Sequence, residues 1–205
     1  MDTSDKLEEI FRNFPGIGPR QAKRFVYHLL TKSQNELSEF STLLTQLKST
    51  VFICPSCFRF HTQKYALDQS GLCSICRDQN RNHRQLMIVA RDIDVGALEK
   101  SRAYSGRYFV LGGTVPILDN DPASKIRQKE LLQLLTDKEF DEIIIATSIN
   151  PESEHTATYI LSLLKKHYEN SKLPKVTTPG RGLSTGTELE YSDADTLRSA
   201  LENRR

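Results

Sequence analysis

The chain has 205 residues, of which 38 % are hydrophobic and 26 % are charged, and its formal net charge is +2. This length suits one compact domain, or one domain with small appendages, and the composition is that of a globular protein. No apolar run approaches the roughly 20 residues of a membrane-spanning helix, and the polar residues 1–5 lack the apolar core of a secretory signal. We therefore expect a cytoplasmic protein without membrane contacts.

Charge is distributed unevenly along the chain. Residues 1–89 hold 12 Lys/Arg against 8 Asp/Glu, whereas residues 90–205 hold 16 against 18. The mildly basic residues 1–89 suggest nucleic-acid binding, and the mildly acidic residues 90–205 suggest binding of a different partner. Charge runs are also common on solvated faces, so the motifs carry more weight than this balance.

The first predicted elements are two helices joined by a glycine turn. A helical pattern at residues 7–13 runs into the Pro-Gly-Ile-Gly-Pro turn of residues 15–19. The second helix is expected from Pro19, because proline is tolerated in the first helical turn. Its apolar side chains follow helical spacing along one face: Ala22, Phe25, Val26, Leu29 and Leu30.

Basic side chains gather after this turn, and residues 10–35 contain no acidic residue. Arg20, Lys23 and Arg24 are predicted on the side opposite to the apolar face. Gly16 and Gly18 let the backbone approach a phosphate closely, at a helix N-terminus whose dipole favours an anion. The segment resembles a helix-hairpin-helix motif and predicts DNA binding without sequence readout. A plain hairpin with a solvated basic face and a self-association surface are the alternatives.

All four cysteines fall into two close pairs, Cys54 with Cys57 and Cys73 with Cys76. The spacing C-x2-C-x15-C-x2-C is typical of a zinc site, because each pair forms a knuckle and the intervening loop lets both knuckles meet at one ion. Four thiolates fill a tetrahedron, so we expect one structural Zn²⁺ per chain and no open position for catalysis. Two disulfides or four buried thiols are the alternatives, and His61, between the pairs, is a further candidate ligand.

Strand and helix patterns alternate through the rest of the chain. Three runs are predicted as buried strands, at residues 85–90, 107–111 and 142–146, and a shorter fourth strand is predicted at residues 175–177. Three helices are expected between them, at residues 95–101, 125–135 and 154–168. This alternation predicts an α/β fold with a small parallel sheet, helices on both faces, and functional residues at the carboxyl ends of the strands.

Helical hairpin, four-cysteine site and parallel sheet, in this order, resemble the RecR family of bacterial recombination mediators over essentially the whole chain. Five strings carry the resemblance: FPGIGP at 14–19, CSIC at 73–76, SGRYFVLGG at 105–113, GTELEY at 186–191 and TLRSALENR at 196–204. The chain departs from the family pattern at three places: the loop 116–122 lacks the usual glycines, Ser153 replaces a glycine, and residues 182–187 lack the usual proline-containing loop.

The resemblance implies a toprim-type sheet, which in catalytic members holds Mg²⁺ with a glutamate after the first strand and two acidic residues after a later one. Ala90 occupies the glutamate position here, while Glu152 and Glu154 align with the later acidic pair. We therefore expect no phosphoryl chemistry, and we expect Glu152 and Glu154 to serve a protein partner. Asp92 and Asp94 are nearby metal-ligand candidates, with helix capping as their alternative. A Mg-dependent toprim nuclease or primase-like enzyme is the competing function.

The resemblance further implies a non-enzymatic mediator of DNA repair and recombination. Such a protein forms a homo-oligomer, a dimer or a tetrameric ring, on single- or double-stranded DNA at the nucleoid. With RecO-like or RecF-like partners it helps to load RecA on single strands. The expected domains are a helix-hairpin-helix segment for DNA binding and oligomerisation, a four-cysteine zinc finger, a toprim-like domain and a C-terminal segment with oligomer contacts, at residues 1–50, 51–82, 83–178 and 179–205.

Overall fold

The computed structural model of the chain describes residues 2–62, 70–180, 182–183, 186 and 188–202. The chain divides into two compact units, Met1–Phe52 and Ile53–Arg205. Among the described helices, none is both long and apolar enough to cross a membrane.

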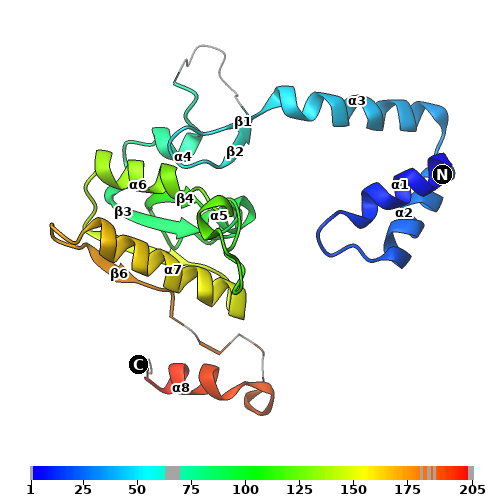
Figure 1. Cartoon of the computed structure of the whole chain (residues 1–205). Coiled ribbons are helices and arrows are strands. Elements are labelled where there is room, and N and C mark those ends of the chain that lie inside the picture. Colours follow the sequence, from blue (N-terminus) through cyan, green and yellow to red (C-terminus); the bar gives the residue numbers. More distant parts are fainter. Residues whose placement is uncertain (1, 63–69, 181, 184–185, 187, 203–205) are drawn as a thin grey trace. The chain divides into compact units, whose positions relative to one another are not determined.

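The N-terminal unit contains three helices: α1 (Thr3–Arg12), α2 (Pro19–Leu30) and α3 (Gln34–Thr50) (Figure 1). α1 begins with a capping box, in which the carboxylates of Asp2 and Asp5 each accept the other residue's backbone amide. α2 begins at Pro19, directly after the glycine turn, as the sequence predicts. The two helices pack through Phe11 and Phe25, whose rings meet edge to face with centroids 5.5 Å apart.

No helix is predicted above for residues 34–50, yet α3 occupies them. Its start is a capping box: the Ser33 hydroxyl accepts the Glu36 amide, and the Glu36 carboxylate accepts the Ser33 amide at 2.9 Å. Leu43, Leu44 and Leu47 follow helical spacing on this helix, and each is more than half exposed. α3 therefore carries an apolar stripe that its own unit leaves in solvent.

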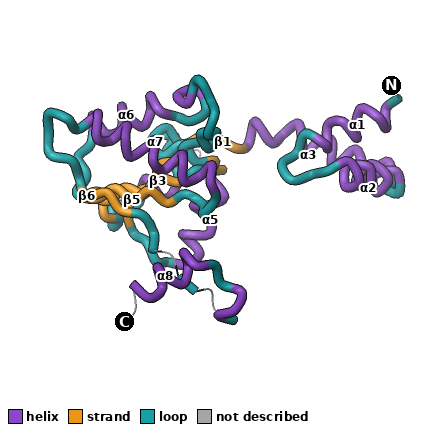
Figure 2. The backbone as a smooth tube through the Cα atoms, turned by 60° about the horizontal axis from the view of Figure 1, so that its bottom comes forward, coloured by secondary structure: helices purple, strands orange, loops and turns teal. Residues whose placement is uncertain are grey.

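Four strands form one sheet in the second unit: β3 (Asn82–Val89), β4 (Gly106–Val110), β5 (Glu142–Ala146) and β6 (Lys175–Thr177). All pairings are parallel, in the order β4-β3-β5-β6. Figure 2 shows β3, β5 and β6 of this sheet next to one another. Leu86 pairs with Arg107 on one side and with Ile143 on the other, which fixes the register at the centre. The predicted parallel α/β fold is confirmed. β5 and β6 have the predicted bounds, whereas β3 begins earlier, at Asn82.

Helices cover both faces of this sheet: α5 (Asp92–Ser101), α6 (Gln128–Asp137) and α7 (Pro151–His167). One face packs against α6 and α7, where Leu131 and Ile160 join Phe109 in a buried cluster. The other face packs against α5 through Val95, and it also receives the four cysteines. The predicted two-sided arrangement is confirmed. One face is shared between α5 and the cysteine module, by which we mean the two knuckles at residues 54–58 and 73–77.

Four helices begin at residues other than predicted: α1 begins at Thr3 instead of residue 7, α5 at Asp92 instead of residue 95, and α6 and α7 also differ. A 3-10 turn, η1 (Pro122–Ser124), precedes α6, and the Arg127 amide then bonds the Leu111 carbonyl at 2.9 Å, which delays the helix to Gln128. α7 begins earlier, at Pro151, because the Asn150 side chain accepts the Ser153 amide at 2.8 Å and caps the helix there.

The remaining described elements are short. β1 (Val51–Ile53) and β2 (Phe60–Thr62) form a two-stranded sheet. α4 (Ser74–Arg77) begins directly after Cys73. Towards the C-terminus come a 3-10 turn, η2 (Leu189–Tyr191), and a helix, α8 (Ala194–Glu202). α8 is capped by Asp193, whose carboxylate accepts the Thr196 amide at 2.9 Å.

Candidate metal centre and nucleic-acid interface

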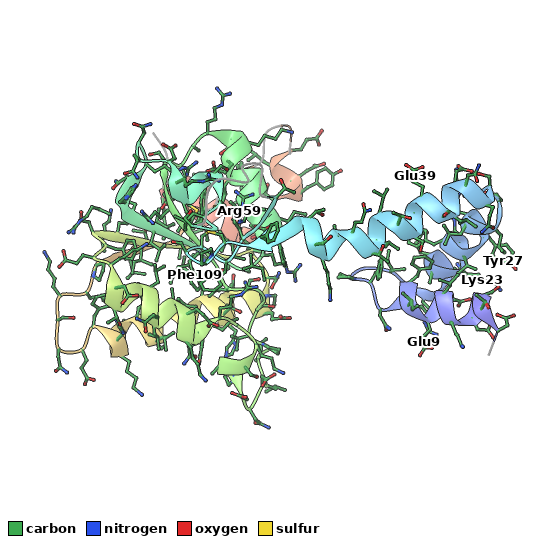
Figure 3. All side chains as sticks on the ribbon, turned by 90° about the horizontal axis from the view of Figure 1, so that it is seen from above. Glu9, Lys23, Tyr27, Glu39, Arg59 and Phe109 are labelled. Atoms are coloured by element: carbon green, nitrogen blue, oxygen red, sulfur yellow. The ribbon has the colours of Figure 1, made fainter. Side chains whose placement is uncertain are left out.

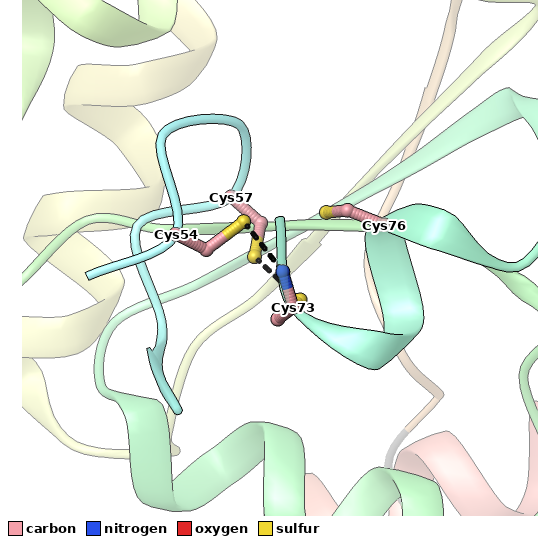
Figure 4. Close-up of side chains that lie close together, drawn as sticks. All are labelled: Cys54, Cys57, Cys73 and Cys76. Carbon is pink, nitrogen blue, oxygen red and sulfur yellow. Dashed lines mark hydrogen bonds between the residues drawn. The ribbon is translucent and has the colours of Figure 1, made fainter. Parts of the chain in front are cut away.

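The four cysteines converge in one buried cluster. The sulfur atoms of Cys54, Cys57, Cys73 and Cys76 all lie within 4.8 Å of one another, and all four are free thiols (Figure 4). The Cys57 and Cys73 sulfurs are 3.6 Å apart. Thiolates at 2.3 Å from a tetrahedral zinc ion lie about 3.8 Å from each other, so the donor set and its spacing fit such an ion.

Backbone hydrogen bonds shape the two knuckles. In the first, the Phe58 amide bonds the Cys54 carbonyl at 2.9 Å, and Phe58 itself adopts a left-handed conformation with φ of 61°. In the second, Cys73 opens α4, and its amide donates to the Cys54 sulfur at 3.4 Å. An amide aimed at a ligand sulfur supports a thiolate, which is the form that binds a metal.

Crowding makes full ionisation of the cysteines costly without a cation. Hydrogen bonding to Cys54 is the largest cause that raises the pKa of Cys57 and of Cys76, and burial raises both further. A dication at the centre of the cluster would stabilise the thiolates instead, so metal binding here releases protons.

His61 does not belong to this cluster. Its Nε2 lies 3.0 Å from the Gly71 carbonyl oxygen, which leads into the second cysteine pair. The histidine thus makes a backbone contact next to the metal centre, while the described groups with metal-ligand spacing are the four cysteines alone.

The cysteine module is fastened to β4, the edge strand of the parallel sheet. The Cys57 carbonyl accepts the Val110 amide at 2.9 Å, and the Phe58 ring packs on Phe109 with centroids 5.4 Å apart. Arg127 lies over Phe58 at 5.6 Å and donates to the Val110 carbonyl at 2.9 Å. The module therefore covers an edge that would otherwise offer unpaired backbone groups.

The basic residues lie on one exposed side of α2. Arg20, Lys23 and Arg24 are exposed, whereas Ala22 and Val26 on the same helix are buried. No acidic residue occurs in α2, and Gly18 precedes it as the N-cap. Gly16 has a φ of 76°, and an added Cβ at either glycine would meet open space. The turn thus presents bare backbone beside three cations, as a phosphate site requires.

Among the described residues, the carboxylates near Ala90 at the carboxyl edge of the sheet form no group with metal-ligand spacing. The side chain of Ala90 is 3 % exposed, and its carbonyl accepts the Gly112 amide at 3.0 Å. Asp92 instead reaches β2, where it accepts the Phe60 amide at 3.2 Å and pairs with a neighbouring arginine. Asp94 caps α5 by accepting the Arg91 amide at 3.0 Å.

The two acidic candidates on α7 point to different sides of the helix. Glu152 is hydrogen-bonded to the Thr114 hydroxyl, which follows β4. Glu154, two residues further, lines a hollow together with Thr178 and Gly180, which follow β6. Residues two apart on a helix do not share a face, so the two carboxylates have different neighbours.

Three family models match segments of the chain: the RecR helix-hairpin-helix at residues 4–48, the Toprim domain at 84–173 and the RecR C-terminal region at 182–205. The Recombination protein RecR of Rippkaea orientalis is 37 % identical over 200 residues, which cover 98 % of this chain and 95 % of the relative. That of Paenarthrobacter aurescens is 38 % identical over 199 residues, 97 % of this chain and 94 % of the relative. The chain belongs to the RecR family.

The matched segments coincide with structural elements. The RecR helix-hairpin-helix match holds α2 with most of α1 and α3, and the Toprim match holds α5 to α7, β4, β5 and nearly all of β3. The four cysteines lie between these two matches, where the structure brings them together.

Sequence reasoning missed three side chains of this RecR-family chain that border the candidate sites. Phe58 and Arg127 join the cysteine module to the sheet, and Tyr27 lies beside the basic residues of α2. The first two meet across more than sixty residues of sequence, so no local pattern reveals them. Tyr27 had a signal, because it follows Arg20, Lys23 and Arg24 at helical spacing.

Proposed function

We propose that this RecR-family chain is a non-enzymatic mediator of DNA recombination and repair, which binds DNA through the basic face of α2. One observation carries the proposal: Arg20, Lys23 and Arg24 lie exposed along a helix that opens directly after a two-glycine turn. This segment lies inside the match to the RecR helix-hairpin-helix. The names of the relatives, recombination proteins, support a role in the same process.

Phosphate is the group that this face would bind. Pro19 has no amide proton and the Gln21 amide bonds the Gly18 carbonyl at 3.1 Å, so attraction at this end rests on the helix dipole and the three cations. Each of the three cations that contacts a phosphate releases counterions, so affinity should fall steeply with salt. Backbone and phosphate contacts carry no base information, so binding is expected to single and double strands of any sequence.

The test replaces Arg20, Lys23 and Arg24 together by alanine in the full chain. The triple variant should bind labelled oligonucleotides much more weakly than wild type, and each lost phosphate contact should reduce the salt slope by about 0.7–0.9. A second triple variant, Lys165→Ala with Lys166→Ala and Lys172→Ala, removes the same charge from exposed positions of the sheet-bearing unit. Equal losses in both variants would show that net charge, and not the α2 face, determines DNA affinity.

We assign one structural Zn²⁺ to Cys54, Cys57, Cys73 and Cys76. The ion supplies a cross-link between the two knuckles and compensates the charge of the thiolates. The protein side of the site is the cysteine module on β4, which the Cys57 carbonyl and the Phe58 ring hold in place.

Homo-oligomerisation, as a dimer or a tetrameric ring around DNA, is part of the proposal. The exposed stripe of Leu43, Leu44 and Leu47 on α3 supports it, because a large apolar stripe in solvent is typical of an interaction surface. A RecO-like or RecF-like partner, with which the protein would help to load RecA on single strands at the nucleoid, would find exposed carboxylates at Glu152 and Glu154.

The Toprim match supports the alternative function, a Mg-dependent nuclease or primase-like enzyme, because Toprim folds can hold Mg²⁺ between strand ends. Ala90 supplies no oxygen ligand, and Asp92 and Asp94 are occupied by β2 and by the start of α5. With Glu152 bonded to Thr114, the described carboxylates do not converge as a two-carboxylate Mg²⁺ site requires. We therefore favour the non-enzymatic function.

A further inference from the structure

Tyr27 extends the basic stripe of α2 by one helical turn. Arg20, Lys23, Arg24 and Tyr27 stand at i, i+3, i+4 and i+7, so they share one side of the helix. Together they line a shallow hollow of about 480 Å³. Its lining consists of three cationic side chains and one aromatic ring, without an acidic group.

The ring of Tyr27 plays little part in holding the fold together. It is 60 % exposed, whereas Phe25 on the other side of α2 packs against Phe11 of α1. The Lys23 ammonium lies over the Tyr27 ring, 6.0 Å from its centroid, and both side chains project from the same part of the unit (Figure 3). A flat apolar surface is thus held in solvent directly beside a phosphate-attracting group.

A charged hollow with an exposed aromatic ring suits one class of ligand, an unpaired nucleotide. The cations attract its phosphates, and the ring offers a stacking platform to its base. Bases of a duplex are stacked inside the helix and cannot reach such a ring without being extruded. We propose that Tyr27 stacks on an unpaired base, so that the α2 face binds single-stranded DNA more tightly than duplex. This inference rests on the proposed DNA-binding function.

Self-association is the other use that an exposed ring could have. Leu30, one turn beyond Tyr27 on α2, is 68 % exposed and apolar but has no ring. Replacing Leu30 by alanine therefore removes exposed apolar surface one helical turn from Tyr27, while it leaves the stacking platform intact. A contact between copies should respond to both substitutions, whereas base stacking should respond to Tyr27 alone.

The experiment compares Tyr27→Ala, Tyr27→Phe and Leu30→Ala in the full chain, at one salt concentration. Three probes are used: a single-stranded oligonucleotide, a duplex of the same length, and an abasic strand that keeps the phosphates but lacks the bases. Tyr27→Ala should weaken single-strand binding roughly 5- to 100-fold. Duplex and abasic binding should stay unchanged, and Tyr27→Phe and Leu30→Ala should behave as wild type.

Tryptophan at this position gives a direct readout, because the chain contains no tryptophan of its own. The fluorescence of Tyr27→Trp protein should be quenched by the single strand and not by the abasic strand. Unchanged single-strand affinity in Tyr27→Ala, or an equal loss on all three probes, would overturn the inference. A different result would contradict the proposed DNA-binding function itself: full affinity for every probe in the variant that lacks Arg20, Lys23 and Arg24.

Discussion

Cys57 connects the metal centre to the sheet through two different atoms. Its sulfur lies in the four-thiol cluster, 3.6 Å from that of Cys73, while its carbonyl accepts the Val110 amide of β4. The next residue, Phe58, adds a ring contact with Phe109. Loss of the proposed Zn²⁺ would therefore loosen the contact with β4 as well as the cysteine loops.

We expect Cys57→Ser to lower both metal content and stability. Metal binding contributes roughly 10–16 kcal/mol in zinc-finger peptides, and losing one of four ligands should forfeit a large part of the contribution here. Thermal unfolding should begin at a markedly lower temperature, and elemental analysis should find well under one zinc per chain. Ser56→Ala, in the same knuckle, is the matched control, and it should keep the zinc content and the unfolding temperature of the wild type. Full stability in zinc-free wild-type protein would contradict a structural role.

Single residues were predictable where local spacing carries the chemistry. The C-x2-C pairs predict the cysteine cluster, because two knuckles with one intervening loop have few other ways to satisfy four thiols. Helical spacing likewise predicts the shared face of Arg20, Lys23 and Arg24, which the structure places on one exposed side. The contact between Arg127 and Phe58 depends on how the knuckle docks on β4, which no local pattern encodes.

At the scale of elements, the start of α3 depends on Ser33 and Glu36. The Ser33 hydroxyl accepts the Glu36 amide, and the Glu36 carboxylate accepts the Ser33 amide and contacts Lys32 at 3.0 Å. The bond from the Ser33 backbone, then that from Lys32, lowers the pKa of Glu36 from 4.5 to about 2. A lowered carboxyl pKa stabilises the fold above pH 4.5 and loses that effect as pH falls towards 2.

We predict that Ser33→Ala loosens the first turn of α3, by about 1 kcal/mol of local stability at neutral pH. Amide hydrogen exchange in residues 34–38 should accelerate, while the strands of the sheet exchange as in wild type. Acid should loosen the same turn of the wild-type helix between pH 4.5 and 2. Glu36→Gln, which keeps the capping geometry without the charge, should lose this pH dependence. If Ser33→Ala exchanges like wild type, the capping box does not hold α3.

Strands were easier to predict than helices in this chain. Buried parallel strands are short continuous apolar runs, and the run at residues 142–146 has its observed bounds. The short strand at residues 175–177 is not buried, but its bounds also match. Helix starts depend on single capping contacts, such as that of the Asn150 side chain with the Ser153 amide. The spacing of apolar residues does not reveal such contacts. α3 has both a capping box and an apolar stripe that includes Leu43 and Leu47. Both features are visible in the local sequence, so this helix was predictable without knowledge of tertiary contacts.

At the scale of the whole molecule, the chain divides its proposed tasks between two compact units. The helical unit carries the cationic face of α2 and the exposed apolar stripe of α3. The second unit carries the cysteine module and a sheet whose carboxyl edge lacks a ligand at Ala90. Membership of the RecR family extends over both, since the relatives align with nearly the full chain.

The mass of the protein in solution, with and without single-stranded DNA, tests the central claim most directly. We predict a particle whose mass is a multiple of the 23.3 kDa chain, which takes up an oligonucleotide without dissociating. The variant that lacks Arg20, Lys23 and Arg24 should keep this multiple and lose the oligonucleotide. A wild-type protein that stays at 23.3 kDa and takes up no DNA at low salt would contradict a DNA-binding assembly.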